Sequence, residues 1–151
     1  VQGRTPAEMT EAAFIWTVAQ TQALHRGVCP RCSAPVERSV ASHCEDHDPG
    51  ERVCEHCKFR YAVLSRIDCS NCDYSPTGTV VSLLLANRDV MAFLTTHGID
   101  PLTDRPELGW EEEILGTDPF EVRYTCTLDG ETLAVTVDES LNVVDVTTGH
   151  S

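Results

Sequence analysis

Residues whose side chains bind soft metal ions crowd into the middle of the chain and form four pairs, each with two residues between its members. A gap of two residues lets a tight turn present both side chains to one ion, and zinc takes four such ligands in a tetrahedron. Eleven residues separate the first pair from the second, and eleven again separate the third from the fourth. One pair would be a weak signal, but four pairs in a duplicated frame predict two zinc ions per chain.

The duplicated spacing predicts that each half of segment 29–72 binds its own ion. The two predicted sites are Cys29, Cys32, Cys44 and His47, and Cys54, Cys57, Cys69 and Cys72. The alternative is an interleaved arrangement, in which the pair Cys29 and Cys32 shares an ion with the pair Cys54 and Cys57. Four protein ligands leave no position for water or substrate, so both ions are expected to be structural. Because the segment has few large apolar residues, metal binding would supply much of its folding free energy.

Other chemistry of the cysteine pairs is less favoured. Disulfides are disfavoured because nothing in the sequence indicates secretion. A redox-active pair would normally lie where a strand meets a helix and would need no partner pair. Iron at the all-cysteine site stays open, because spacing does not distinguish it from zinc. Zinc sensing is disfavoured because four soft ligands suit permanent binding. His43 and His56 could replace His47 as a ligand, but both are expected to lie in loops.

The remaining candidate residues favour structural roles. Cys126 lies on the apolar side of a predicted strand, where a thiol acts as a small apolar group. The acidic run Glu111–Glu113 is expected to be solvated, and Trp16 and Trp110 are expected to pack in the core. The sequence contains no nucleophile elbow, phosphate loop or metalloprotease motif, so we expect no enzymatic activity.

The first predicted element is a helix that starts at Thr5 and stops at Gly27. Thr5 and Glu8 form a capping box, and Pro6 suits the first turn. Apolar residues cover more than one stripe of this helix, so it needs cover on two sides. That cover comes either from its own domain, or from a second copy or an upstream domain.

The segment after the cysteines predicts short helices followed by strands. Apolar residues recur at helical spacing over 80–94, and Asn87 could cap a second helix. From Phe120 the apolar residues alternate, which predicts a strand over 120–128, and Asp129-Gly130 predicts the hairpin turn after it.

Two further strands, over 132–138 and 141–147, complete an antiparallel meander. The predicted fold class is therefore α+β: an N-terminal helix, two zinc-ribbon-like knuckle modules, and short helices packed on a C-terminal β-meander. The predicted division is 1–28 for the helix, 29–72 for a double zinc-ribbon module and 73–151 for an acidic α+β domain.

The composition is strongly acidic, with 24 acidic against 11 basic residues and a net charge of −13 in 151 residues. Residues 73–151 carry 15 of the acidic residues, and Lys58 is the single lysine. This combination of many acidic residues with a single lysine resembles proteins of extreme halophiles, whose acidic surfaces stay hydrated in concentrated salt. Because no apolar run approaches the roughly 20 residues of a membrane helix, we expect a cytoplasmic protein. The start at Val1 suggests a processed chain or a fragment.

The chain resembles the C-terminal region of haloarchaeal ArsR-like winged-helix transcriptional regulators over residues 5–148. The resemblance is carried by the segments Gly27–Cys32, Cys44–His47, Cys69–Cys72, Phe93–Gly98 and Asp118–Phe120. It implies a DNA-binding helix-turn-helix domain upstream of this region, and an accessory role in dimerisation or sensing for the region itself.

These observations together predict a non-enzymatic, zinc-binding regulatory or dimerisation module that forms a homodimer. The alternative is a sensor that binds a small molecule between the meander and its helices. The acidic balance predicts that this chain does not bind nucleic acid directly. The remaining route to DNA would be a row of arginines on one face of the ribbons, namely Arg31, Arg38, Arg60 and Arg66.

Overall fold

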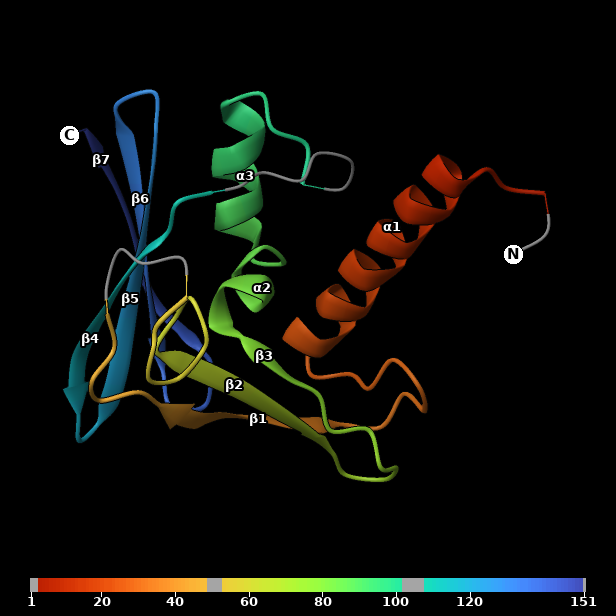
Figure 1. The fold of residues 1–151 in the computed structure, drawn as a ribbon, viewed down its shortest axis with the longest axis horizontal. Coiled ribbons are helices and arrows are strands. Elements are labelled where there is room, and N and C mark those ends of the chain that lie inside the picture. Colours follow the sequence, from red (N-terminus) through yellow and green to blue (C-terminus); the bar gives the residue numbers. More distant parts are fainter. Residues whose placement is uncertain (1–2, 49–52, 102–107, 151) are drawn as a thin grey trace.

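The computed structural model describes residues 3–48, 53–101 and 108–150. Helix α1 precedes a three-stranded antiparallel sheet, two short helices and a four-stranded antiparallel sheet (Figure 1). The elements are α1 (Pro6–His25), β1 (Val36–His43), β2 (Val63–Cys69), β3 (Thr77–Thr79), α2 (Val80–Leu84), α3 (Arg88–Thr96), β4 (Glu111–Thr117), β5 (Phe120–Leu128), β6 (Glu131–Asp138) and β7 (Val143–His150). The predicted α+β class is confirmed. None of the helices in these ranges is long and apolar enough to cross a membrane.

Helix α1 begins and ends where the sequence predicts. The amide of Glu8 donates to the Thr5 hydroxyl at 3.2 Å, and the Glu8 carboxylate accepts from the Thr5 amide at 3.4 Å. Gly27 follows the helix with φ +81°, a conformation that favours glycine. The helix extends away from the rest of the molecule (Figure 1), and of its residues only Leu24 is buried. Trp16, which was expected in the core, is 63% exposed.

Helices α2 and α3 are separate because Asn87 caps the second one. Its side chain accepts hydrogen bonds from the amides of Asp89 and Val90. The predicted split into two short helices is therefore confirmed, and Gly98, at φ +76°, lies just beyond α3.

The C-terminal sheet has the strand order β4-β5-β6-β7. Strand β5 has the predicted bounds, and the predicted hairpin turn follows it. Asp129 and Gly130 both have positive φ, at +51° and +80°, as a two-residue turn between twisted strands requires. Strand β4 was not predicted, because its three glutamates indicated a solvated segment.

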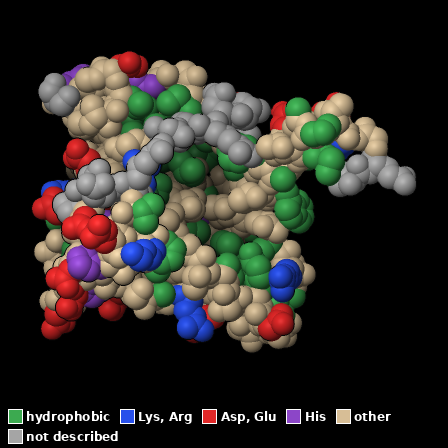
Figure 2. Space-filling view, viewed as in Figure 1, with side chains coloured by type: hydrophobic (Ala, Val, Ile, Leu, Met, Phe, Trp, Pro, Cys, Tyr) green, Lys and Arg blue, Asp and Glu red, His purple; other side chains and the backbone are tan. Residues whose placement is uncertain are grey.

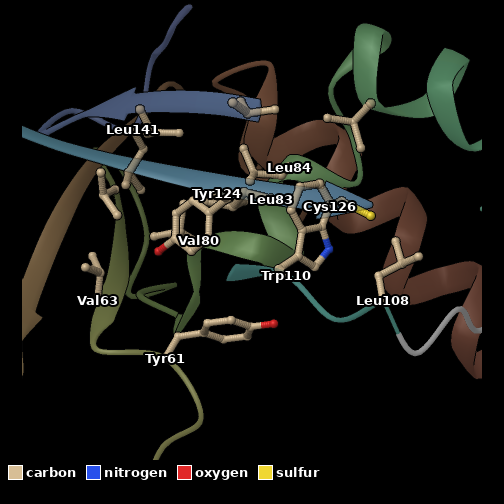
Figure 3. Close-up of a cluster of buried hydrophobic side chains, with 14 of the residues drawn as sticks. Tyr61, Val63, Val80, Leu83, Leu84, Leu108, Trp110, Tyr124, Cys126 and Leu141 are labelled. Carbon is tan, nitrogen blue, oxygen red and sulfur yellow. The ribbon is translucent and has the colours of Figure 1, made fainter. Parts of the chain in front are cut away.

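Helices α2 and α3 pack on one face of this sheet and bury a single apolar cluster (Figures 1 and 3). Strand β2 contributes to the same cluster, so the cysteine-rich hairpin shares a core with the meander. The cluster includes Tyr61, Val63 and Ile67 from β2 and its approach, Leu84, Val90 and Leu94 from the helices, and Val122, Tyr124 and Leu133 from the sheet.

Glu112 joins the cysteine-rich hairpin to the meander. Its carboxylate accepts hydrogen bonds from the amides of Ala62 at 2.7 Å and Val63 at 3.3 Å, and from the Tyr124 hydroxyl at 2.7 Å. Burial and the neighbouring Glu112 charge raise the pKa of Tyr124, so its hydroxyl keeps the proton that it donates. The prediction that Glu111–Glu113 is a solvated run is wrong for the middle residue, because alternate residues of a strand point to opposite faces.

Candidate metal centres

The pairing of β1 with β2 decides which ligands meet. The strands are antiparallel, with Val36 opposite Cys69 and His43 opposite Val63. Residues before β1 therefore lie beside residues after β2, and residues after β1 lie beside those before β2. The hairpin thus brings together an outer group at one end, Cys29, Cys32, Cys69 and Cys72, and an inner group at the other, Cys44, His47, Cys54 and Cys57.

The predicted sequential pairing is wrong, because it requires the two ends of β1 to meet. Strand β1 has eight residues, and at roughly 3.3 Å per residue such a strand spans about 26 Å. Cys32 precedes the strand and Cys44 follows it, so they lie at opposite ends. The interleaved alternative fails for the same reason, since Cys54 and Cys57 precede β2. All eight predicted residues are nevertheless brought together in two sets of four.

The outer group has spacings that match one tetrahedral zinc ion. The Sγ atoms of Cys29 and Cys72 are 3.7 Å apart, and those of Cys32 and Cys69 are 3.4 Å apart. Zinc–sulfur bonds of about 2.3 Å place two sulfurs of a tetrahedron about 3.8 Å apart. These two spacings suit a zinc ion, and all four ligand atoms lie within 4.8 Å of one another.

The inner group uses a histidine that the structure orients for binding through Nδ1. His47 Nδ1 lies 3.4 Å from Cys57 Sγ, close to the roughly 3.6 Å edge that zinc–nitrogen and zinc–sulfur bonds give. The other ring nitrogen, Nε2, lies 2.9 Å from the Arg60 carbonyl oxygen. Donation of the Nε2 proton to that carbonyl leaves the Nδ1 lone pair directed at the group, which is the usual support for a metal-binding histidine.

The two flanking histidines have other contacts. The His43 ring packs against Phe120, with ring centroids 5.6 Å apart. His56 lies beside the inner group, but its backbone amide donates to Cys54 Sγ at 3.4 Å, and its ring belongs to neither ligand group. His47 is thus the histidine that the structure assigns to the inner group.

Tight turns place the first and third ligand pairs in the same way. The carbonyl of the first cysteine, Cys29 or Cys54, accepts the amide of the residue four positions later, Ser33 or Lys58, at 2.9 Å in both cases. Ser33 and Lys58 have φ of +68° and +67°. The shared conformation turns the two sulfurs of each pair toward the same point, as the repeated spacing predicted.

Backbone amides prepare a thiolate in the outer group. The amides of Cys72 and Asn71 donate to Cys69 Sγ and lower the pKa of that thiol to about 6. The Tyr74 amide lowers the pKa of Cys72, but burial and the neighbouring thiols together outweigh it and raise the pKa to about 12. Cys69 is therefore the more readily ionised of these two thiols, and Cys72 keeps its proton more tightly.

The inner group shows the same contrast. Burial raises the pKa of Cys54, but nearby backbone amides, including that of Cys57, lower it to about 6. Burial, and then the Cys57 side chain, raise the pKa of Cys44 to about 11. A divalent cation would displace protons from both groups, because zinc binds thiolates.

Each group is a closed set of four ligands. A zinc ion with four thiolates has a net charge of −2, and one with three thiolates and a neutral imidazole has −1. Cys126 belongs to neither group and is buried on β5, as predicted, where burial raises its pKa. The arrangement suits metal-stabilised folding, because all four positions around each ion are occupied by protein.

Comparison with known proteins gives one match. Residues 1–143 match a family described as a domain of unknown function (DUF7351). No curated protein and no solved structure matches. The resemblance to winged-helix regulators therefore stays a prediction from the sequence.

Proposed function

This chain belongs to the DUF7351 family, and we propose that it is a non-enzymatic regulatory module whose fold depends on two structural zinc ions. The observation that carries the proposal is the pair of four-ligand groups, whose donor atoms all lie within 4.8 Å of one another in each group. Soft ligands at tetrahedral spacing favour zinc, and full protein ligation favours a structural role.

The ions would clamp the β1–β2 hairpin at both ends. The hairpin gains only the three-residue strand β3 as a third strand, and a two-stranded hairpin alone is marginally stable in water. The inner ion would fix the segment that leads into Tyr61 and Ala62, and the outer ion would fix the segment that follows α1. The module would thereby fix the position of α1 relative to the meander.

We further propose that DNA recognition belongs to another domain of a longer regulator. The two arginines on strands β1 and β2, Arg38 and Arg66, do not share one face of the sheet. Arg66 lies opposite Ser39 in the register, so it lies on the other face of the sheet from Arg38. Arg38 donates to the His25 carbonyl at 2.6 Å and to Asn142 at 3.0 Å, which supports a structural role for it.

Metal analysis tests the zinc proposal. Protein purified without chelators should contain two zinc ions per chain, and X-ray absorption should report seven sulfur ligands and one nitrogen ligand over the two ions. One ion, or none, would refute the proposal. Iron in the outer group would refute the choice of metal for that group.

Paired substitutions test which ligands share an ion. Cys29→Ser with Cys72→Ser removes two ligands of one group and should leave one ion. Cys29→Ser with Cys44→Ser damages both groups and should leave none. The opposite result would show the sequential pairing in solution.

Binding to random duplex DNA across a salt series tests the accessory role. We expect no binding tighter than micromolar, because phosphate contacts need clustered basic side chains. Micromolar or tighter binding that weakens as salt rises would move the chain to a DNA-contacting role.

A further inference from the structure

Helix α1 has a second apolar face, centred on Trp16, that the described part of the chain leaves largely exposed. The half-buried residues Phe14, Val18, Thr21, Gln22 and His25 lie on the side toward the body. The opposite side carries the exposed residues Met9, Trp16 and Ala19 and the half-buried residues Ala12 and Ala23. Their alternating spacing of three and four residues is that of a helix-pairing seam. Trp16 is 63% exposed and Met9 43% exposed, and Figure 2 shows apolar side chains along the helix.

This face is also uncharged in a strongly acidic chain. Residues 12–24 contain no charged side chain, although the chain has a net charge of −13. Glu8 and Glu11 lie before this segment, and Arg26 lies after it. Two copies could thus approach along α1 with less repulsion than along the acidic meander.

We propose that this face of α1 pairs with the same face of a second copy, antiparallel and with a two-fold axis near Trp16. Trp16 lies at the midpoint of Pro6–His25, so an antiparallel pair places the two Trp16 side chains together at the centre. A two-fold axis also makes the contact self-complementary and closed, which limits assembly to a dimer.

The charges at the helix ends favour the antiparallel direction. Glu8 and Arg26 are 18 residues apart, which is five full turns at 3.6 residues per turn, so both lie on the same flank of the seam. A two-fold antiparallel pair brings Glu8 beside Arg26 of the partner subunit, and the contact occurs twice. A parallel pair would lose this contact and would place like charges at the same end of the seam.

The expected association is weak and strengthened by salt. A helix of 20 residues is about 30 Å long and roughly 10 Å wide, so the seam buries about 300 Å² per copy, below the ~800 Å² of a standard interface. Screening reduces the repulsion between two acidic copies, so dimerisation should increase with salt. The dimer deepens the proposed regulatory role, but it does not depend on the zinc ions.

Sedimentation equilibrium tests the pairing on the full chain from about 1 µM to 1 mM, where dissociation constants of such weak contacts lie. The parent chain should show a monomer–dimer equilibrium that shifts toward dimer in concentrated salt. Trp16→Glu should weaken it by at least ~30-fold, because it places two charges together at the centre of the seam. Val144→Glu is the matched control, since Val144 is 51% exposed on β7, and it should leave association unchanged.

Charge substitution tests the direction. Arg26→Glu should weaken the dimer, and adding Glu8→Gln should recover part of the loss, because it removes the like charge and keeps an acceptor for the capping box; circular dichroism checks that α1 remains helical. A parent chain that stays monomeric in concentrated salt, a Trp16→Glu variant that still dimerises, or a double variant that recovers nothing would overturn the proposal. Metal content is measured in parallel: a monomer with two bound ions refutes the helix pair alone, and a metal-free dimer refutes the zinc proposal alone.

Discussion

The Glu112 carboxylate joins the cysteine-rich hairpin to the meander, and Glu112→Gln should destabilise the protein measurably. The carboxylate accepts three hydrogen bonds, from two amides and from the Tyr124 hydroxyl. An amide side chain has nearly the same shape but offers one acceptor oxygen and a donor group. At least one backbone amide, at Ala62 or Val63, then faces a donor instead of an acceptor.

The expected loss follows from these contacts. A hydrogen bond to a charged group contributes about 1.5–3 kcal/mol, so losing one in a half-buried position should lower the free energy of unfolding by about 2–3 kcal/mol. For a chain of this length, each kcal/mol corresponds to roughly 2–4 °C, which predicts a fall in melting temperature of about 4–12 °C.

Urea and thermal unfolding, followed by fluorescence with both ions bound, measure the change. Glu113→Gln is the control, because Glu113 neighbours Glu112 on β4 but pairs with Arg123 at the surface. An exposed pair of this kind is worth at most about 1 kcal/mol. Equal losses in the two variants, or a Glu112→Gln melting temperature within about 1 °C of the parent, would show that Glu112 does not anchor the hairpin.

Two further predictions concern acid and the end of α3. Metal affinity should fall steeply as pH drops below about 6. The Cys54 and Cys69 thiols, with pKa of about 6, then take up protons that compete with the metal. Equal affinity at pH 5 and pH 7.5, measured with a chelating dye, would contradict this. His97 lies between Asp129 at 3.2 Å and Glu131 at 3.0 Å. His97→Gln should therefore lower the free energy of unfolding by about 1 kcal/mol, because it weakens the contact between α3 and the β5–β6 turn. Unchanged urea unfolding would count against that contact.

Features set by neighbouring residues were predictable from the sequence. The capping box at Thr5 and Glu8 fixes the start of α1, and the Asp129-Gly130 turn fixes the β5–β6 hairpin, because each involves residues at most three positions apart. The identity of the eight candidate ligands was predictable for the same reason. A spacing of two residues constrains the conformation of each knuckle without reference to the rest of the chain.

Features set by distant partners were not predictable in this way. The grouping of the ligands depends on the antiparallel register of β1 with β2, and the repeated eleven-residue gap carries no information about that register. Strand β4 was not predicted because the sequence shows Glu112 only as part of a charged run. Its partners Ala62 and Tyr124 come beside it only in the folded chain. Trp16 was assigned to the core because composition cannot say which side of a helix the body covers.

The two ligand groups differ in how they connect to the meander. The inner group reaches it through two hydrogen bonds: His47 Nε2 with the Arg60 carbonyl, and the Ala62 amide with the Glu112 carboxylate. The outer group lies at the other end of the hairpin, where the Ser70 amide and hydroxyl both donate to the Pro35 carbonyl. Loss of one ion should therefore have different consequences from loss of the other.

Hydrogen exchange on two single variants tests this asymmetry. Cys57→Ser removes an inner ligand and should reduce the protection of the Tyr124 and Val135 amides, which lie opposite each other on β5 and β6. A loss of about 1.4 kcal/mol appears as a tenfold faster exchange in cooperative opening. Cys72→Ser removes an outer ligand and should leave those amides protected while the segment after α1 exchanges. If both variants leave the Tyr124 and Val135 amides protected, the hairpin and the meander open independently. The chain would then consist of two folding units that divide near residue 73, despite their shared core.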